Sequence, residues 1–482
     1  MKFNTKCVHG SGRPDSTGAI SPAIYMSSTF SHPKLGDTTG YQYTRESNPT
    51  RDRLEQLIAG LEDGKDALAF SSGMAAVDAV FHLFSPGDHI ILGDDLYGGS
   101  IRMFTNIYEQ NGIEFTYVGT SDLDAVKAAF KPNTKAVYIE TPTNPMMEIT
   151  DIRALCTLAH DHNALFIIDN TFLSPYFQKP LNLGADIVVH SGTKFIGGHH
   201  DVISGFTIVN DDELAAKLRL TYKTVGACLS AMDSWLVIRG VKTLALRMEQ
   251  HQKNAIALAE WLKKQPKVTK VLFPGLPEHP GYEINKAQTT GFGGMLSFEV
   301  DSEETAKQIL EGIKLIQFAE SLGGTESLLT YPVTQTHPDL KPEDAERKGI
   351  TRRLLRLSVG IEDTDEIGRA QVLNMSSWVT QNVVLTTVKQ LKNKNGVPNP
   401  TEINIGRFFT THEFFTQAGL NMPEMFVKLG YGEEIPAIDN NTNPLPDGLV
   451  WIRGMDFRPV LSDMGVVEES VAQRDRILKE IS

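Results

Sequence analysis

Short apolar runs alternate with helix-like segments through the first half of this chain, and this alternation constrains the fold more than any other feature. The runs are rich in Val, Ile, Leu or Phe, which is typical of buried strands. Strand, helix and strand in repeated order predict an α/β fold with a mostly parallel sheet covered by helices on both faces. The runs that we interpret as strands are residues 68–70, 89–92, 136–140, 165–169 and 186–190.

The last of these predicted strands runs into Ser191, Gly192, Thr193 and Lys194, and then into a Gly-rich turn. A lysine on a buried loop loses its proton more readily and can become a nucleophilic amine. Taken alone, a solvated lysine beside a turn is an equally good interpretation. Asp169, however, ends the preceding predicted strand. A carboxylate for a pyridine nitrogen and an amine for an aldehyde are the two protein groups that pyridoxal phosphate requires.

Other predicted strand ends carry polar or small residues, as open α/β sheets do where they bind ligands. Ser72, Gly73 and Met74 open a predicted helix, whose free N–H groups could bind a phosphate. A small-residue turn that allows close packing is the alternative. Tyr97 lies between acidic residues and two glycines, where its ring could cover a flat ligand or simply sit on the surface. Two prolines fix the loop that carries Asn144.

The region 236–380 is expected to form a smaller α+β domain. It begins within a predicted long amphipathic helix around residues 233–248 and contains predicted strands at 291–300 and 354–361. Arg356 lies among apolar neighbours in the second strand. A buried guanidinium is costly unless it is paired, so a substrate carboxylate is a plausible partner, with a structural Arg–Glu pair as the alternative.

Composition narrows the class of protein. A net charge of −13 over 482 residues, without a clustered basic face, argues against nucleic acid as a partner. Cys7, Cys156 and Cys228 form neither a CxxC motif nor a disulfide framework, which favours a reducing cytoplasm. No apolar run is long enough to span a membrane. We find no metal-ligating cluster, and His412 with Glu413 is too isolated to form one.

Domain boundaries follow from shifts in composition. We expect an N-terminal arm at residues 1–50, a cofactor-binding domain at 51–235, the smaller domain at 236–380 and an extension of unknown role at 381–482. Residues 389–400 are polar with Gly and Pro and are interpreted as a linker. The remaining extension is too apolar for a disordered tail and includes a predicted helix from 466 to 481.

Seven motifs give the chain a specific resemblance. They are Y-x-R-x-x-N-P-T at 43–50, S-S-G-M at 71–74, D-x-Y-G-G at 95–99, E-x-P-T-N-P at 140–145, D-N-T-F at 169–172, H-S-x-T-K-x-x-G-G-H at 190–199 and R-x-S-V-G-I-E at 356–362. From about residue 5 to about 378 the chain resembles the pyridoxal-phosphate enzymes of cysteine and methionine metabolism, the γ-synthase and γ-lyase group. This resemblance implies the type I fold of these enzymes, with a seven-stranded sheet between helices.

The resemblance also implies roles for individual residues. Lys194 would hold pyridoxal phosphate covalently and carry protons, Asp169 would pair with the pyridine nitrogen, and Tyr97 would stack on the ring. The phosphate would be bound by Ser72, Gly73, Met74, Ser191 and Thr193, joined by Tyr43 and Arg45 of a neighbouring subunit. The amino-acid substrate would contact Arg356 through its α-carboxylate, with Asn144, Ser321, Arg102 and Glu326 nearby. A shared site implies a homo-oligomer, at least a dimer and usually a tetramer.

The expected reaction depends on residues 330–337, T-Y-P-V-T-Q-T-H. Lyases of the group tend to end this segment with P-A-x-M-T-H, whereas the form found here resembles bacterial cystathionine γ-synthases that also act as O-acetylhomoserine thiolyases. We therefore expect γ-replacement on an O-acylhomoserine, with a cystathionine γ- or β-lyase as the alternative. A nucleotide-binding P-loop is disfavoured because Lys194 is followed by Phe195 rather than by Ser or Thr.

Overall fold

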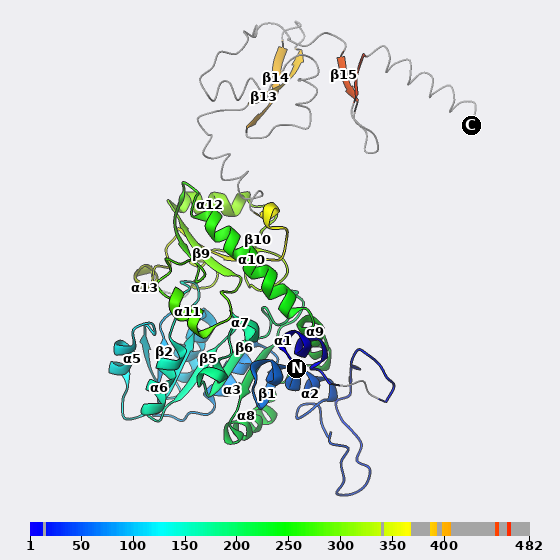
Figure 1. Cartoon of the computed structure of the whole chain (residues 1–482), viewed down its shortest axis with the longest axis vertical. Coiled ribbons are helices and arrows are strands. Elements are labelled where there is room, and N and C mark those ends of the chain that lie inside the picture. Colours follow the sequence, from blue (N-terminus) through cyan, green and yellow to red (C-terminus); the bar gives the residue numbers. More distant parts are fainter. Residues whose placement is uncertain are drawn as a thin grey trace, which may run out of the picture. The chain divides into compact units, whose positions relative to one another are not determined.

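The computed structural model describes residues 1–12, 16–338, 342–367, 386–392, 398–405, 449–452 and 460–463. It separates into two compact units, residues 1–371 and 372–482, which we describe in turn (Figure 1). No helix among these described residues is long and apolar enough to cross a bilayer.

A seven-stranded sheet organises the first unit, and its strand order is β1-β7-β6-β5-β4-β2-β3. Neighbouring strands from β6 through β5, β4 and β2 to β3 are parallel, whereas β7 runs antiparallel to both β1 and β6. The mostly parallel sheet expected from the sequence is therefore confirmed. The bounds are β1 (Asp66–Phe70), β2 (His89–Gly93), β3 (Glu114–Val118), β4 (Thr134–Glu140), β5 (Leu165–Asp169), β6 (Ile187–Ser191) and β7 (Gly205–Val209).

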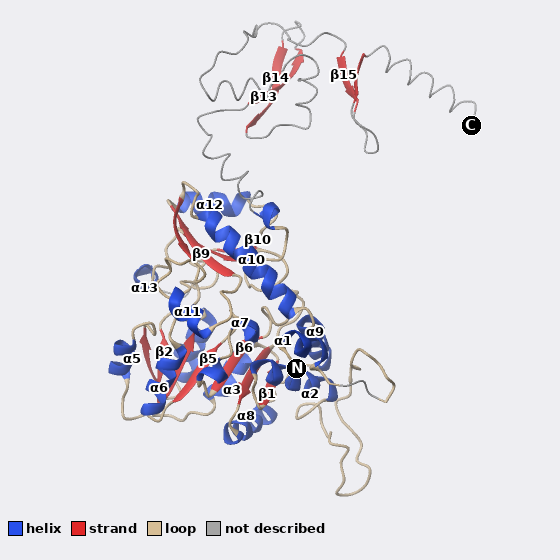
Figure 2. Ribbon diagram, in the orientation of Figure 1, coloured by secondary structure: helices blue, strands red, loops and turns tan. Residues whose placement is uncertain are grey.

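Helices cover both faces of this sheet, as Figure 2 shows. One apolar core joins α1, α2, α6 and α9 to one face, and a second joins α3, α4, η1 and α8 to the other. Asn48 caps α2 by accepting from the Thr50 N–H, with Pro49 at the first helical position. The helices are α1 (Phe3–His9), α2 (Pro49–Glu62), α3 (Gly73–Phe81), α4 (Gly98–Met103), the π-helix η1 (Phe104–Tyr108), α5 (Leu123–Ala129), α6 (Ile152–Asp161), α7 (Ser174–Phe177), the 3-10 helix η2 (Pro180–Leu183), α8 (Asp212–Val225) and α9 (Ala231–Val241).

A smaller sheet in the same unit has the order β10-β11-β12-β9-β8 and packs against the long helix α10. It is antiparallel except between β10 and β11. Together with its helices it forms the α+β region that follows the large sheet. Its elements are α10 (Leu244–Leu262), β8 (Val268–Leu272), α11 (Tyr282–Gln288), β9 (Met295–Val300), α12 (Glu303–Gly312), β10 (Gln317–Phe318), β11 (Leu328–Thr330), α13 (Pro342–Arg347) and β12 (Leu354–Ser358).

The single helix expected around residues 233–248 is wrong, because α9 ends at Val241 and α10 begins at Leu244. Thr243 leaves the helical region, with φ −108° and ψ 6°. The Arg247 guanidinium donates to the Gly240 carbonyl at 2.9 Å and to the Thr243 hydroxyl at 3.1 Å. A side chain thus satisfies a carbonyl at the end of α9 that a continuous helix would have bonded internally.

The described residues of the second unit form two antiparallel strand pairs. β13 (Thr386–Lys392) pairs with β14 (Pro398–Ile405), and β15 (Leu449–Ile452) pairs with β16 (Val460–Asp463). The linker expected at residues 389–400 is therefore wrong, since both ends of that stretch lie in paired strands. The helix expected at 466–481 and the His412–Glu413 pair lie outside the described residues.

Candidate active site

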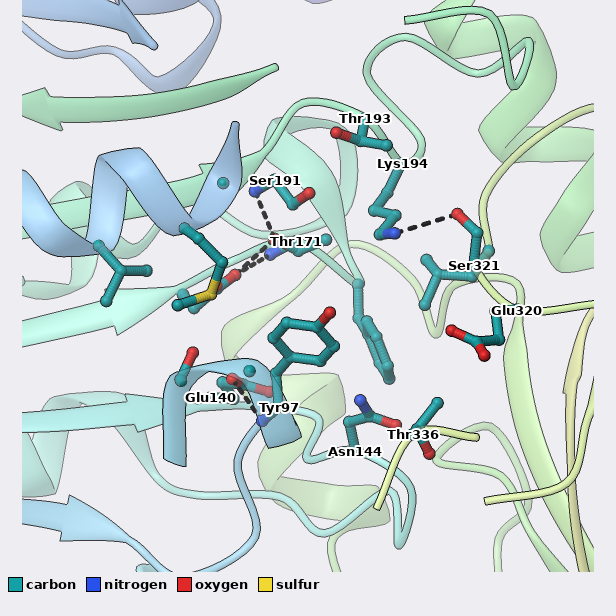
Figure 3. Close-up of a pocket in the computed structure, with 18 of the residues that line it drawn as sticks. Tyr97, Glu140, Asn144, Thr171, Ser191, Thr193, Lys194, Glu320, Ser321 and Thr336 are labelled. Atoms are coloured by element: carbon teal, nitrogen blue, oxygen red, sulfur yellow. Dashed lines mark hydrogen bonds between the residues drawn. The ribbon is translucent and has the colours of Figure 1, made fainter. Parts of the chain in front are cut away.

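A cavity of about 420 Å³ opens at the carboxyl ends of β4, β5 and β6 in the first unit (Figure 3). Its walls come from the loops after these strands, the start of α3, the segment around Ser321 and β12. Twelve of the predicted site residues line it: Ser72, Gly73, Met74, Tyr97, Arg102, Asn144, Asp169, Ser191, Thr193, Lys194, Ser321 and Arg356. The structure thus brings together residues that are up to 284 positions apart in the sequence, from Ser72 to Arg356.

Lys194 follows the end of β6 and reaches into this cavity. Its Nζ donates to the Ser321 Oγ at 3.0 Å. Burial and, after it, the nearby Arg356 guanidinium lower the pKa of Lys194 from 10.5 to about 8, although Asp169 and Glu320 oppose this change. A lysine whose amine is partly neutral near physiological pH is suited to covalent catalysis.

Asp169 ends β5, the neighbouring strand, and its carboxylate is held by Thr171. Oδ1 accepts from the Thr171 N–H at 2.9 Å and from the Thr171 hydroxyl, while that hydroxyl accepts from the Ser191 N–H at 2.8 Å. Burial raises the pKa of Asp169, and the Thr171 hydrogen bonds counteract this effect. Donors on the anionic form favour a charged aspartate in a buried site.

The start of α3 forms a third wall. Ser72 caps the helix, with its Oγ accepting from the Ala75 N–H at 3.0 Å, so the N–H groups of the next two residues are left without intrahelical acceptors. A Cβ on Gly73 would lie 2.9 Å from the Ser191 Cβ, so only glycine allows this close approach. The Thr193 hydroxyl already pairs with the Ser204 backbone, at 3.2 Å to its carbonyl and 3.0 Å from its N–H.

Arg356 lies at the far end of the cavity and is 2% exposed. It donates to the Asn144 Oδ1 at 2.8 Å, the Ser321 carbonyl at 3.2 Å and the Thr330 hydroxyl at 3.2 Å, while its Nε has no partner. Burial lowers the pKa of this guanidinium from 12.5 to about 10. No carboxylate of the described residues forms an ion pair with it, so the geometry favours an incoming carboxylate over the structural Arg–Glu pair.

Tyr97 projects its ring into the cavity, as Figure 3 shows, and its backbone N–H donates to the Glu140 Oε1 at 2.9 Å. Tyr97 is 44% exposed, so its ring is free to cover a flat ligand. Glu140, Thr171, Glu320, Gln335 and Thr336 also line the cavity, although sequence reasoning gave none of them a role. Glu140 and Thr171 could have been found, because both lie inside motifs that carry the family resemblance.

Three predicted site residues do not line the cavity. Tyr43 and Arg45 lie on the N-terminal arm, where the Arg45 guanidinium is 5.5 Å from the Tyr43 ring and donates to the Lys223 carbonyl. Their expected role in a neighbouring subunit stays a prediction. Glu326 has a 60% exposed side chain whose carboxylate is 3.8 Å from the His200 Nε2, outside the cavity wall.

The chemistry of these donors fits pyridoxal phosphate. The cavity offers one amine of lowered pKa, one carboxylate that accepts two hydrogen bonds from Thr171, and a helix start with free N–H groups and no side chain at Gly73. These are the groups that an aldehyde, a pyridine nitrogen and a phosphate respectively require. Lys194 and Asp169 would hold the reactive part of the cofactor, and Gly73, Met74 and Ser191 its phosphate.

Comparison with known proteins agrees with this geometry. The family model described as Cys/Met metabolism PLP-dependent enzyme matches residues 4–370. Cystathionine beta-lyase of Lactococcus lactis subsp. cremoris (strain MG1363) is 49% identical over 366 residues, covering 76% of this chain and 96% of the relative. Cystathionine gamma-synthase of Haemophilus influenzae (strain ATCC 51907 / DSM 11121 / KW20 / Rd) is 48% identical over 359 residues, covering 74% and 93%.

A solved structure gives the same result for the fold. The cystathionine gamma-lyase of Lactobacillus plantarum, complexed with L-serine, matches with a TM-score of 0.76 and 46% identity, covering 78% of this chain and 100% of that structure. One conclusion follows from the sheet order, from the lysine, aspartate and arginine of the cavity, and from these similarities. The chain belongs to the Cys/Met metabolism family of pyridoxal-phosphate-dependent enzymes.

Proposed function

We propose that this enzyme catalyses γ-replacement on an O-acylhomoserine, in which the thiol of cysteine or sulfide displaces the acyloxy group to give cystathionine or homocysteine. The observation that supports an amino-acid substrate is the burial of Arg356. Its guanidinium lines the same cavity as Lys194 and has no anionic partner among the described residues. A substrate α-carboxylate would supply the missing charge and occupy the planar guanidinium.

The choice of replacement rests on the segment 330–337, which resembles synthases. Gln335 and Thr336 from this segment line the cavity, so residues there are placed to influence the fate of the substrate. Gln335 is fixed because its Oε1 accepts from the Tyr331 N–H at 2.7 Å, and Thr336 pairs with the His337 Nδ1 at 2.8 Å. A polar wall at this position suits a second, thiol-bearing substrate.

Bound pyridoxal phosphate would supply an electron sink for negative charge that develops on the substrate carbons. Arg356 and Asn144 would hold the substrate carboxylate so that its α-proton faces the Lys194 amine. Lys194, held near Ser321 at 3.0 Å, would take this proton and then a proton from the substrate β-carbon, so that the acyloxy group can leave the γ-carbon. Once the thiol has added at the γ-carbon, Lys194 would return protons to the substrate. Tyr97 would cover the reacting carbons and exclude water while the thiol adds.

Lyase activity is the second candidate, and the named relatives support it as much as they support γ-replacement. A β-lyase at 49% identity and a γ-lyase structure at 46% are as similar to this chain as the γ-synthase at 48%. The same lysine, aspartate and arginine would serve a carbon–sulfur cleavage of cystathionine. The two reactions differ in whether a thiol is captured before the product leaves.

We further propose a homo-oligomer in which the arm of one subunit completes the site of another. The exposed positions of Tyr43 and Arg45 outside their own cavity support this arrangement. A cytoplasmic location is part of the proposal, because Cys7, Cys156 and Cys228 are all free thiols.

The experiment that tests the reaction uses purified protein with pyridoxal phosphate. With O-acetylhomoserine and cysteine we expect cystathionine to form faster than 2-oxobutyrate, and we expect cystathionine alone to be turned over slowly. The Lys194→Ala variant is the control for background chemistry. Rapid cleavage of cystathionine without any thiol adduct of O-acetylhomoserine would reject γ-replacement and leave the lyase.

A further inference from the structure

Two carboxyl groups stand side by side on the floor of the cavity. Glu140 is the last residue of β4 and Asp169 the last of β5, and the register of the two parallel strands places them opposite each other. Neighbouring strands are about 4.8 Å apart, and paired residues of parallel strands face the same side. Both residues line the cavity, so both carboxyl groups belong to one small space.

The surroundings of the two groups differ. Asp169 accepts an N–H and an O–H from Thr171 and faces the cation of Lys194. Glu140 is 7% exposed, accepts one hydrogen bond, from the Tyr97 N–H, and has no ion-pair partner within the described part of the chain. Two like charges at this distance in a buried site do not both ionise readily. The donors favour Asp169 as the anion.

The charged and titratable groups that face Glu140 all raise its pKa. They are Asp169 on β5 and Asp95 in the loop between β2 and α4, and both disfavour a second negative charge. Burial raises the pKa of Glu140 well above its usual range, Asp169 and Asp95 raise it further, and the Tyr97 N–H opposes them. The single opposing group is a neutral dipole, so these surroundings favour the protonated form of Glu140.

Tyr97 depends on this carboxyl for its position. Glu140 holds its backbone N–H at 2.9 Å, and a Cβ on Gly99 would lie 2.4 Å from the Tyr97 Cε1, so the ring lies directly against Gly99. Figure 3 shows the Glu140 side chain at the base of the Tyr97 loop. The hydrogen bond to the Tyr97 N–H and the contact of the Tyr97 ring with Gly99 together fix the direction in which the ring points.

We propose that Glu140 is a positioning residue that carries a proton: it holds Tyr97 over the cofactor and adds no second negative charge beside Asp169. The proposal rests on the assignment of Tyr97 and Asp169 to the cofactor. It explains why an acidic side chain is tolerated next to the carboxylate that must stay ionised. It also predicts that a neutral residue with the same acceptor replaces Glu140 without loss.

The test compares Glu140→Gln with Glu140→Ala by the affinity of the cofactor-free protein for pyridoxal phosphate, measured by equilibrium dialysis. Glutamine keeps the carbonyl that accepts from the Tyr97 N–H, so we expect affinity within about threefold of wild type. Alanine leaves that N–H without an acceptor and frees the ring, so we expect affinity about 10-fold weaker, which corresponds to ~1.4 kcal/mol. A Glu140→Gln protein as weak as Glu140→Ala would overturn the proposal.

Infrared spectroscopy of the cofactor-free protein tests the proton directly. At neutral pH the wild-type spectrum should contain a protonated-carboxyl C=O band that shifts in D₂O and is missing in Glu140→Gln, or in Glu140→Ala should the glutamine variant not fold. Glu114→Gln is the matched control, because this glutamate on the same sheet is ion-paired with Lys131 at 3.3 Å and should contribute no such band. Absence of the band in wild type would refute the proposal. Neither measurement needs turnover, so the idea can fail while the proposed reaction stands.

Discussion

Arg51 and Arg356 are both almost completely buried, and their different partners make a sharp prediction. Arg51 is 0% exposed, and its Nε lies 3.6 Å from the Glu55 carboxylate. Arg356 is 2% exposed and bonds only to neutral acceptors. We expect Arg51→Met to damage stability and Arg356→Met to damage substrate binding.

The expected changes in unfolding free energy depend on which buried groups each substitution leaves without a partner. Removing one partner of a buried ion pair costs about 3–5 kcal/mol, and we expect the lower end for Arg51→Met because Arg219 still faces Glu55 at 3.7 Å. Arg356→Met strips a donor from three acceptors, at about 1–3 kcal/mol each. It also removes a buried charge without an anionic partner, which restores several kcal/mol. The net change in unfolding free energy should lie within about 2 kcal/mol of zero.

Catalytic efficiency should change in the opposite order, with a large loss of kcat/KM in Arg356→Met and almost none in Arg51→Met. A carboxylate that loses two charge-assisted hydrogen bonds to Arg356 loses roughly 3–6 kcal/mol of binding, a factor of about 10²–10⁴ in kcat/KM. Arg51 does not line the cavity, so Arg51→Met should keep kcat/KM within about threefold in the folded fraction. Urea unfolding of the cofactor-free proteins and steady-state kinetics of the loaded ones give the two readouts. An Arg356→Met protein that unfolds as easily as Arg51→Met and keeps its kcat/KM within about tenfold of wild type would contradict this prediction.

Two further predictions concern the lysine and the arm. Because the pKa of Lys194 is lowered from 10.5 to about 8 in the folded chain, the unfolded chain binds more protons between these values, and the stability of the cofactor-free wild type should rise with pH there relative to Lys194→Met. Urea unfolding at about pH 7 and about pH 10 measures this difference, expected to be about 3 kcal/mol at most, and a flat difference contradicts the shifted pKa. If Arg45 serves a neighbouring subunit, mixing inactive Arg45→Ala with inactive Lys194→Ala subunits should restore some activity. No recovery after verified subunit exchange would count against a shared site.

The sequence predicted the strand ends well, because apolar runs that stop abruptly at polar residues carry a strong local signal. Asp169 and Lys194 were found this way. β3 and β7 were not predicted: β3 is a half-exposed edge strand, and β7 runs antiparallel after a short connection from Ser191 to Gly205, which breaks the strand–helix rhythm. The break between α9 and α10 depends on Arg247 reaching back to Gly240, a tertiary contact without a periodic signature.

The same difference between local patterns and tertiary contacts applies to the residues of the site. Thr171 bonds to Asp169 two residues earlier, a local turn pattern that the sequence could have revealed. Glu326 was placed in the pocket by the family resemblance and not by a local signal in the sequence. The backbone turns at Gly323, where φ is +76°, and Glu326 ends beside His200 instead. The pairing of Glu140 with Asp169 required the register between β4 and β5, which sequence alone does not supply.

Reduction of the loaded enzyme with borohydride, followed by peptide mass spectrometry, tests the central assignment most directly. Borohydride fixes a lysine-bound pyridoxal group permanently to its nitrogen. Lys194 is the lysine that lines the described cavity opposite Asp169, so its peptide should carry the whole pyridoxyl mass. The same peptide from Lys194→Ala should carry none. A pyridoxyl group on any other lysine, or a wild-type protein that binds the cofactor without a reducible bond, would contradict the account.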